Sequence, residues 1–220
     1  MKRRIFLGSL ATIGTVGTLG GCLGLADPNP NVTLGEPDRQ FDSSDVPYQA
    51  WGERVPDVTI PAPVDSRSVS LRTVDTPTVI TFFFSHCMTI CPVLISALRN
   101  VQTDAMNNGY ANQVTFLPIT FDPARDHAQR LQAYAEEMNI ADGAGNWYFL
   151  RPDSEQSATQ IIQKEFGVMF EKTPTKKQSG YMFTHTPLTL LVNADGYVER
   201  AYKTKSPDQE TIIDDLAKLR

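Results

Sequence analysis

The sequence predicts an α/β protein in which helices flank a central mixed sheet and an N-terminal extension precedes the folded domain. From residue 78 onward, uncharged runs rich in β-branched and aromatic residues alternate with stretches of helical periodicity. A hairpin pattern and a last helical stretch close the chain. The first 65 residues lack this alternation, since they hold an apolar leader and then seven of the chain's 15 prolines.

The N-terminal leader predicts export. Two adjacent arginines precede the uncharged, glycine-rich residues 5–21, which end in Leu-Gly-Gly before Cys22. A short basic region, a short apolar region and small residues before a cut site are typical of a signal peptide. The paired arginines favour the twin-arginine route, and Leu-Gly-Gly-Cys resembles a lipobox. We therefore expect residues 1–21 to be removed and Cys22 to carry a lipid; an uncleaved transmembrane helix is the alternative.

The extension is predicted to hold the domain on the outer face of the cytoplasmic membrane. Residues 22–54 form the lipidated N-terminus and the tether in this interpretation, and residues 55–220 form the folded domain. Prolines at this density disfavour regular helix or central strand. The net charge of −5 argues against a nucleic-acid partner, which requires a basic surface.

The strongest strand pattern covers residues 78–84, which carry no charge and are typical of a central strand buried on both faces. Pro92 suits the first position of a helix, and apolar residues recur at helical spacing to about residue 104. A second buried strand is predicted at residues 114–121. Asp122, followed by proline, then predicts the N-cap of a helix over residues 124–138.

The remaining elements are predicted from shorter patterns. They are short strands at 57–60 and 69–71, a strand at 147–150, a helix that Asp153 caps and that ends near 166, a strand at 189–192, a turn at 193–196, its hairpin partner at 197–202 and a closing helix at 209–219. This order of strands and helices is that of a thioredoxin-like fold.

Cys87 and Cys91 lie where the first buried strand turns into a helix. Unpaired backbone N–H groups and the helix dipole stabilise a thiolate there, and residues four apart share one helical face. A structural disulfide closing so short a loop gains little. In an exported protein the pair therefore indicates redox activity or metal binding; two buried small hydrophobic residues are the alternative.

His185 is the candidate third ligand. It lies just before the predicted strand at 189–192, and in a thioredoxin-like fold the loop entering this strand lies beside the cysteine turn. Two thiolates and one imidazole suit Cu(I) and accept Cu(II). We therefore predict one copper ion bound by Cys87, Cys91 and His185. A solvated side chain is the alternative for a lone histidine in a loop.

Four further side chains near the predicted site have less definite roles. His86 either tunes the neighbouring thiolate, joins a Cu(II) coordination sphere or points away. His127 begins a polar helix and is expected to be solvated. Met88 and Met182 offer soft thioethers but are expected to pack in the core or at the rim of the site.

Three segments together resemble the Sco/SenC family of copper-binding, thioredoxin-fold proteins, which serve cytochrome c oxidase assembly. They are a strand followed by Cys87-x-x-x-Cys91-Pro92, the Thr-Phe-Asp-Pro-Ala-Arg-Asp motif at 120–126, and His185-Thr186 followed by Asn-Ala-Asp-Gly at 193–196. The resemblance spans roughly residues 55–220. It implies copper ligation by Cys87, Cys91 and His185. It also implies a partner, cytochrome c oxidase subunit II or another copper-accepting protein, which receives copper at its Cu-A centre or has its cysteines reduced.

The sequence departs from the family pattern at three places. The usual Pro-Asp after the first cysteine is Met88-Thr89, and the usual Asp before the histidine is Thr184. Pro187 is similar to the cis-proline that faces the cysteines of thiol–disulfide oxidoreductases. The proposed ligands are retained, and these changes favour a redox role.

Three functional hypotheses follow from these residues. The first is a metallochaperone that passes copper to a partner by ligand exchange. The second is a thiol–disulfide reductase in which Cys87 attacks and Cys91 resolves. The third, a peroxide-reducing enzyme or a redox sensor, is disfavoured because no arginine lies between Thr73 and Leu98.

Overall fold

The computed structural model describes residues 29–38, 42–175 and 180–220. The predicted export signal and Cys22 lie outside these described residues. Among the described residues, no helix combines the length and the apolar character that crossing a membrane requires.

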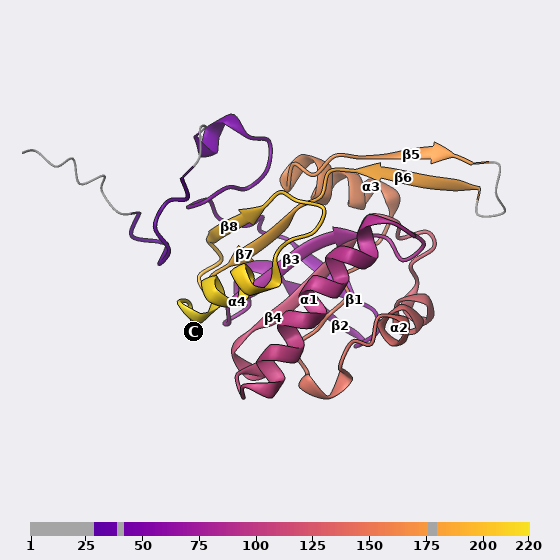
Figure 1. The fold of residues 1–220 in the computed structure, drawn as a ribbon. Helices are drawn as coiled ribbons and strands as arrows, with labels where there is room; N and C mark the ends of the chain where they lie inside the picture. The colour runs from indigo at the N-terminus through magenta and orange to yellow at the C-terminus, as the bar shows by residue number, and fades with distance from the viewer. Residues whose placement is uncertain (1–28, 39–41, 176–179) are drawn as a thin grey trace, which may run out of the picture.

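A four-stranded mixed sheet forms the centre of the fold, in the order β4-β3-β7-β8 (Figure 1). Its strands are β3 (Thr78–Phe83), β4 (Thr115–Thr120), β7 (Thr189–Val192) and β8 (Val198–Tyr202). β3 and β4 are parallel, whereas β7 is antiparallel to both β3 and β8. Every residue of β3 is buried, as predicted for a central strand.

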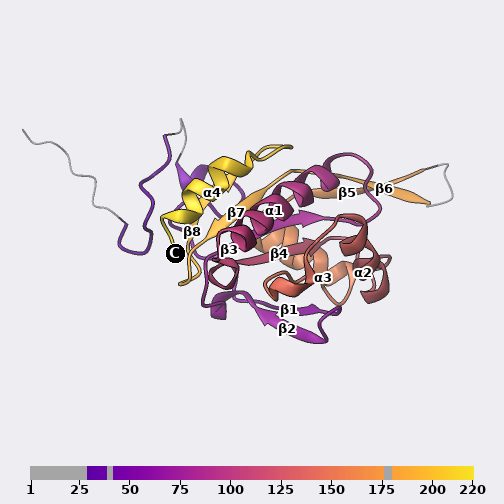
Figure 2. The same cartoon turned by 60° about the horizontal axis from the view of Figure 1, so that its bottom comes forward.

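Helices α1 (Ile90–Asn107) and α4 (Gln209–Ala217) lie together on one face of this sheet. Asn100 of α1 donates a side-chain hydrogen bond to Gln209 of α4. The hairpin of β1 (Thr59–Ala62) and β2 (Arg67–Ser70) lies on the other side (Figure 2). Layers on both faces of a mixed sheet are the predicted thioredoxin-like arrangement.

Aromatic side chains of β3 fill the core on both faces of the sheet. The Phe82 ring contacts Phe166 with centroids 5.0 Å apart, and the Phe83 ring stacks on Tyr134 at 5.6 Å. Adjacent strand residues point to opposite faces, so these pairs join β3 to two different layers. Each fully buried phenylalanine contributes about 1.5–3 kcal/mol through the hydrophobic effect.

The lead-in before the sheet also packs on the domain. Leu34 and Tyr48 belong to the same buried core as the sheet. Glu199 on β8 is fully buried and accepts backbone hydrogen bonds from Thr33 and Leu34 at 2.9 Å and 2.8 Å. A buried carboxylate that receives several donors is stabilised in place, and here it holds the extension against the sheet edge.

Two predicted helix starts are wrong. Helix α2 covers Ala128–Glu137, so it begins four residues after the predicted start at residue 124, and its N-cap is His127. Asp122 is not a cap: it is buried and bound by side chains from elsewhere in the fold. Likewise Ser154, rather than Asp153, caps α3 (Glu155–Ala158), which continues as the π-helix η5 (Thr159–Glu165).

The predicted strand at 147–150 forms only isolated bridges, between Trp147 and Phe116 and between Leu150 and Ile119. The other predicted strands and the closing helix are present within a few residues of their expected bounds. In the part of the chain that the structure describes, four short 3-10 turns connect the elements: η1 (Ser43–Asp45), η2 (Leu71–Thr73), η3 (Ala111–Gln113) and η4 (Asp142–Ala144).

A hairpin that the sequence did not predict carries the candidate histidine. It consists of β5 (Phe170–Pro174) and β6 (Tyr181–His185), which pair antiparallel (Figure 1). Phe183 and Phe170 pack their rings on Phe121 at 5.2 Å and 5.0 Å. These contacts fix the base of the hairpin beside the carboxyl ends of β3 and β4, where the cysteine loop begins.

Candidate metal centre

The cysteine loop connects the end of β3 to the start of α1. The Cys87 N–H donates to the Phe84 carbonyl at 3.2 Å, which bends the chain back toward the helix. The Cys91 N–H then donates to Cys87 Sγ at 3.4 Å. The N-cap residue, Thr89, accepts no hydrogen bond from the helix through its side chain. The sulfur of Cys87 therefore takes the place of a capping oxygen at the positive end of α1.

The two thiols differ in protonation. The pKa of Cys87 is lowered to about 4, chiefly by the hydrogen bond that the Cys91 side chain donates, and this outweighs the effect of burial. Burial raises the pKa of Cys91 above its ordinary value, and the neighbouring Cys87 acts in the same direction. At neutral pH the site thus holds one thiolate and one thiol, and Cys91 is the more deeply buried of the two.

His185, the last residue of β6, contacts Cys91. Its Nε2 lies 3.5 Å from Cys91 Sγ, while its Nδ1 donates to the Thr186 carbonyl at 3.3 Å. The Nδ1 bond leaves the Nε2 lone pair facing the sulfur. Burial lowers the pKa of His185, which favours the neutral imidazole that binds metals.

The donor set fits a soft metal ion, since it offers two sulfurs and a correctly oriented neutral imidazole. Cys91 contacts both of the other proposed ligands: its N–H donates to Cys87 Sγ, and its sulfur lies against His185 Nε2. The three ligand atoms do not all lie within 4.8 Å of one another, in contrast to a second cluster of polar groups nearby.

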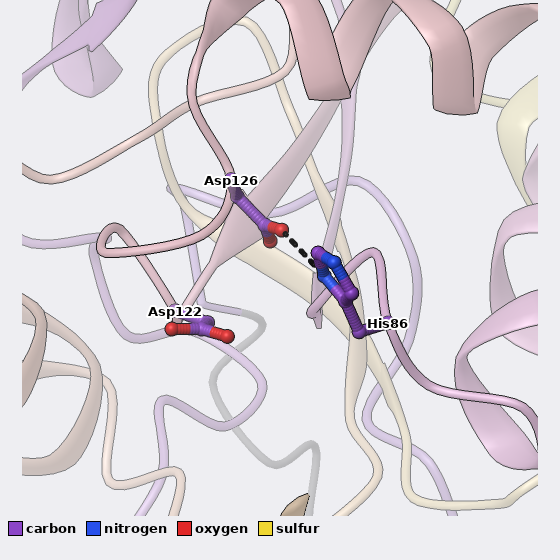
Figure 3. Close-up of side chains that lie close together, drawn as sticks. All are labelled: His86, Asp122 and Asp126. Carbon is purple, nitrogen blue, oxygen red and sulfur yellow. Dashed lines mark ion pairs between the residues drawn. The ribbon is translucent and has the colours of Figure 1, made fainter. Parts of the chain in front are cut away.

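That second cluster consists of His86, Asp122 and Asp126 (Figure 3). His86 Nδ1 lies 3.7 Å from Asp126 Oδ1, so His86 points toward the carboxylate. Asp122 forms a buried ion pair with Arg125 and accepts a 2.9 Å hydrogen bond from the Tyr181 hydroxyl. Because both carboxylates are already bound by protein donors and one is paired with a guanidinium, we interpret this cluster as structural.

Asp126 is a residue whose role the sequence did not indicate. It is fully buried outside any helix and accepts hydrogen bonds from the Ser85 N–H at 3.1 Å and from the Thr120 hydroxyl. Arg130 donates to the Ser85 hydroxyl and carbonyl, both at 2.9 Å. These bonds fix the chain two residues before Cys87. The acidic motif at 120–126 was visible in the sequence, but Arg130 had no recognisable signal.

The other side chains considered near the site also have defined places. Met88 is 86% exposed, so it does not pack in the core. Met182 is partly buried and lines a groove together with Cys87. His127 caps α2 through a 3.3 Å bond from the Arg130 N–H. No cis peptide bond occurs among the described residues, so the expected similarity of Pro187 to a cis-proline is wrong.

Comparison with known proteins places the domain in a family. A family model described as SCO1/SenC matches residues 66–220. A putative copper-binding protein from Stutzerimonas stutzeri is 28% identical over 117 residues, covering 52% of this chain and 52% of that protein. The chain spans about half the length of the curated relatives it matches.

Solved structures share the fold. The copper-bound structure of Bradyrhizobium japonicum ScoI aligns with a TM-score of 0.63 at 21% identity, covering 76% of this chain and 100% of that one. A SCO1/SenC family lipoprotein from Bacillus anthracis aligns with the same TM-score and identity, covering 77% of this chain and 95% of that one. At this identity the likeness establishes a common fold.

Proposed function

Because the chain belongs to the SCO1/SenC family, we propose that it binds one copper ion through Cys87, Cys91 and His185 and delivers it to the Cu-A centre of cytochrome c oxidase subunit II. The observation that carries the proposal is the contact of His185 Nε2 with Cys91 Sγ beside the Cys87 thiolate. Copper is the cargo here, so the site must both hold it and release it.

The chain's own residues suit a transferable cargo. Cys87 is already a thiolate, whereas Cys91 must lose its proton before its sulfur can bind a metal. His185 needs no deprotonation, because its ring proton is on Nδ1 and its Nε2 lone pair already faces the Cys91 sulfur. Cys87 borders an open groove, so an incoming sulfur or imidazole can approach the copper from that side and replace the chain's ligands one at a time.

A thiol–disulfide reductase is the second candidate, and the unequal cysteines favour it. The Cys87 thiolate would attack a partner disulfide, forming a mixed disulfide and releasing the partner's other sulfur as a thiolate. Cys91 would then lose its proton to His185 Nε2, 3.5 Å away, and attack Cys87. The partner leaves with both cysteines reduced, and its two electrons come from the chain, which retains a Cys87–Cys91 disulfide.

A transfer experiment distinguishes the two candidates. The full-length chain with Cys22→Ser, loaded with Cu(I), is mixed with the soluble domain of subunit II in its reduced, copper-free form. Copper delivery predicts that copper moves to the partner. In a parallel reaction without copper, the partner is supplied oxidised, and the reductase candidate predicts free partner thiols together with an oxidised chain. Copper that stays on the chain, together with rapid partner reduction, would replace the first proposal with the second.

We also infer that the chain works outside the cytoplasm on a lipid anchor at Cys22. The twin-arginine leader and the Leu-Gly-Gly-Cys sequence support this inference, and a related protein from Bacillus anthracis is a lipoprotein. Mass spectrometry of the N-terminal peptide from membranes tests it. A diacylglyceryl group on Cys22 is expected, and an intact leader with an unmodified Cys22 would contradict the inference.

A further inference from the structure

One edge of the β5–β6 hairpin is unpaired, and the hydrogen-bond register shows which groups it presents. The Thr186 N–H donates to the Met169 carbonyl at 2.9 Å, and the Thr175 N–H donates to the Gly180 carbonyl at 3.0 Å. In an antiparallel ladder, hydrogen-bonded pairs alternate with non-hydrogen-bonded pairs. In β6 the backbone groups of Met182 and Thr184 therefore face β5.

The backbone groups of Tyr181, Phe183 and His185 consequently point away from β5. Arg125 Nη1 donates to the Tyr181 carbonyl at 3.1 Å, which occupies one end of this edge. Within the described part of the chain, β6 has no strand partner other than β5. The N–H and C=O of Phe183 are thus left in the middle of a free strand edge.

A groove lies between β6 and the first turn of α1, and Phe183 is one of its lining residues. It has a volume of about 510 Å³, and β6 lines one side of it from Met182 to His185. Cys87, Ile90 and Val93 line the opposite side. Figure 1 shows β6 between β5 and the N-terminal end of α1. Of the two proposed cysteine ligands, only Cys87 reaches the groove wall.

The groove also offers a charged contact. Among the described residues that line it, Lys205 is the one lysine or arginine, so a carboxylate on a ligand can form an ion pair there. Its walls otherwise combine apolar side chains with a free strand edge. This is the pattern that binds extended peptides: main-chain hydrogen bonds give affinity and side pockets give specificity. Soluble proteins normally protect such edges.

We propose that the groove binds an extended, acidic, cysteine-containing segment of the partner protein, which adds to β6 by exchanging two backbone hydrogen bonds with Phe183. This pairing would run the segment past Cys87, so that its cysteine meets the site. The inference rests on the proposed function and specifies how the partner docks. It applies equally to copper delivery and to disulfide reduction, because both require a partner sulfur at Cys87.

Disulfide trapping tests the docking mode. The full-length chain with Cys22→Ser and Cys91→Ser is treated with a blocked peptide, Asp-Val-Cys-Val-Asp, whose cysteine carries a 2-thiopyridyl group. Cys87 attacks the peptide sulfur, the new disulfide joins peptide to chain, and 2-thiopyridine leaves. Amide hydrogen exchange is then followed by NMR, with the chain capped at Cys87 by a methylthio group as the matched control.

The proposal predicts that exchange of the Phe183 amide slows by at least about tenfold in the peptide conjugate. The Thr184 amide, which already faces β5, should not change. A peptide N-methylated at its two valines and its cysteine should give no protection. Unchanged exchange at Phe183 in the unmodified conjugate would overturn the proposal.

The charge preference has its own test. The acidic peptide should react with Cys87 faster than a matched Lys-Val-Cys-Val-Lys peptide, and Lys205→Glu should reverse that preference. An unchanged rate ratio would remove the acidic requirement. Copper affinity is measured separately on the same chain, so failure of the groove proposal and failure of the copper proposal are distinguishable.

Discussion

Asp126 is predicted to stabilise the fold by fixing the loop that carries Cys87. Its buried carboxylate accepts the Ser85 N–H at 3.1 Å and hydrogen bonds from the hydroxyls of Ser85 and Thr120. Asp126→Asn keeps the shape but places an amide NH₂ where an acceptor is needed. Hydrogen bonds to a charged group contribute about 1.5–3 kcal/mol each, and the substitution disrupts one or two of the three.

We therefore expect Asp126→Asn to lower the free energy of unfolding by about 2–4 kcal/mol. For a domain of this size, that corresponds to a decrease in Tm of roughly 4–16 °C. Urea unfolding monitored by tryptophan fluorescence measures the change. Asp195→Asn is the matched control, because Asp195 is exposed in a turn and should cost less than about 0.5 kcal/mol. Equal stability of the two variants would refute the role assigned to Asp126.

Two further predictions concern the backbone and the thiolate. Gly167 has φ +66°, and an added Cβ would lie 1.6 Å from the Pro47 carbonyl oxygen, whereas Gly145 has φ +61° and open space around it. Gly167→Ala should therefore lower the free energy of unfolding by at least about 2 kcal/mol more than Gly145→Ala does. Equal losses in the two variants would contradict the close approach of Gly167 to Pro47. Because the pKa of Cys87 is lowered to about 4 chiefly by the Cys91 side chain, its thiolate persists down to that pH in the chain that retains Cys91. Alkylation of Cys87 by iodoacetamide in the reduced Cys22→Ser chain, followed by mass spectrometry of the Cys87 peptide, should therefore change little between about pH 8 and pH 5. A fall of about a thousandfold over this range, as for an ordinary thiol, would contradict the assignment.

The central sheet was predictable because its strands are buried on both faces. Residues 78–84 and 114–121 read as uninterrupted apolar or β-branched runs, and the structure places β3 and β4 there. The same pattern predicted where the cysteines lie, because Cys87 and Cys91 come directly after the end of the buried strand, at the start of the helix that follows it. Local sequence sufficed because these elements bury nearly all of their side chains.

The β5–β6 hairpin was not predictable in this way. Four of the five β5 residues are exposed, so no alternation of apolar and polar residues marks the strand. Its stability comes from the backbone ladder and from Phe170 and Phe183 at its base. The contact of His185 with Cys91 could be expected from the order of elements, but the strand that carries His185 could not.

The misplaced start of α2 has a similar cause. Asp122 followed by proline is a typical helix N-terminus in sequence. In the structure the Tyr181 hydroxyl, 59 positions along the chain, binds the carboxylate that would otherwise cap the helix. A contact between residues so far apart in the sequence leaves no local signal at Asp122. The N-cap of α2 is His127 instead.

An anaerobic Cu(I) titration against a competing chelator tests whether Cys87, Cys91 and His185 together bind copper. The reduced full-length chain with Cys22→Ser is compared with the same chain carrying His185→Ala or, as the control for loss of an imidazole, His127→Ala. We expect one tightly bound copper ion, a copper affinity weakened at least about tenfold by His185→Ala, and no change in affinity with His127→Ala. Equal affinities for the two histidine variants would contradict this expectation.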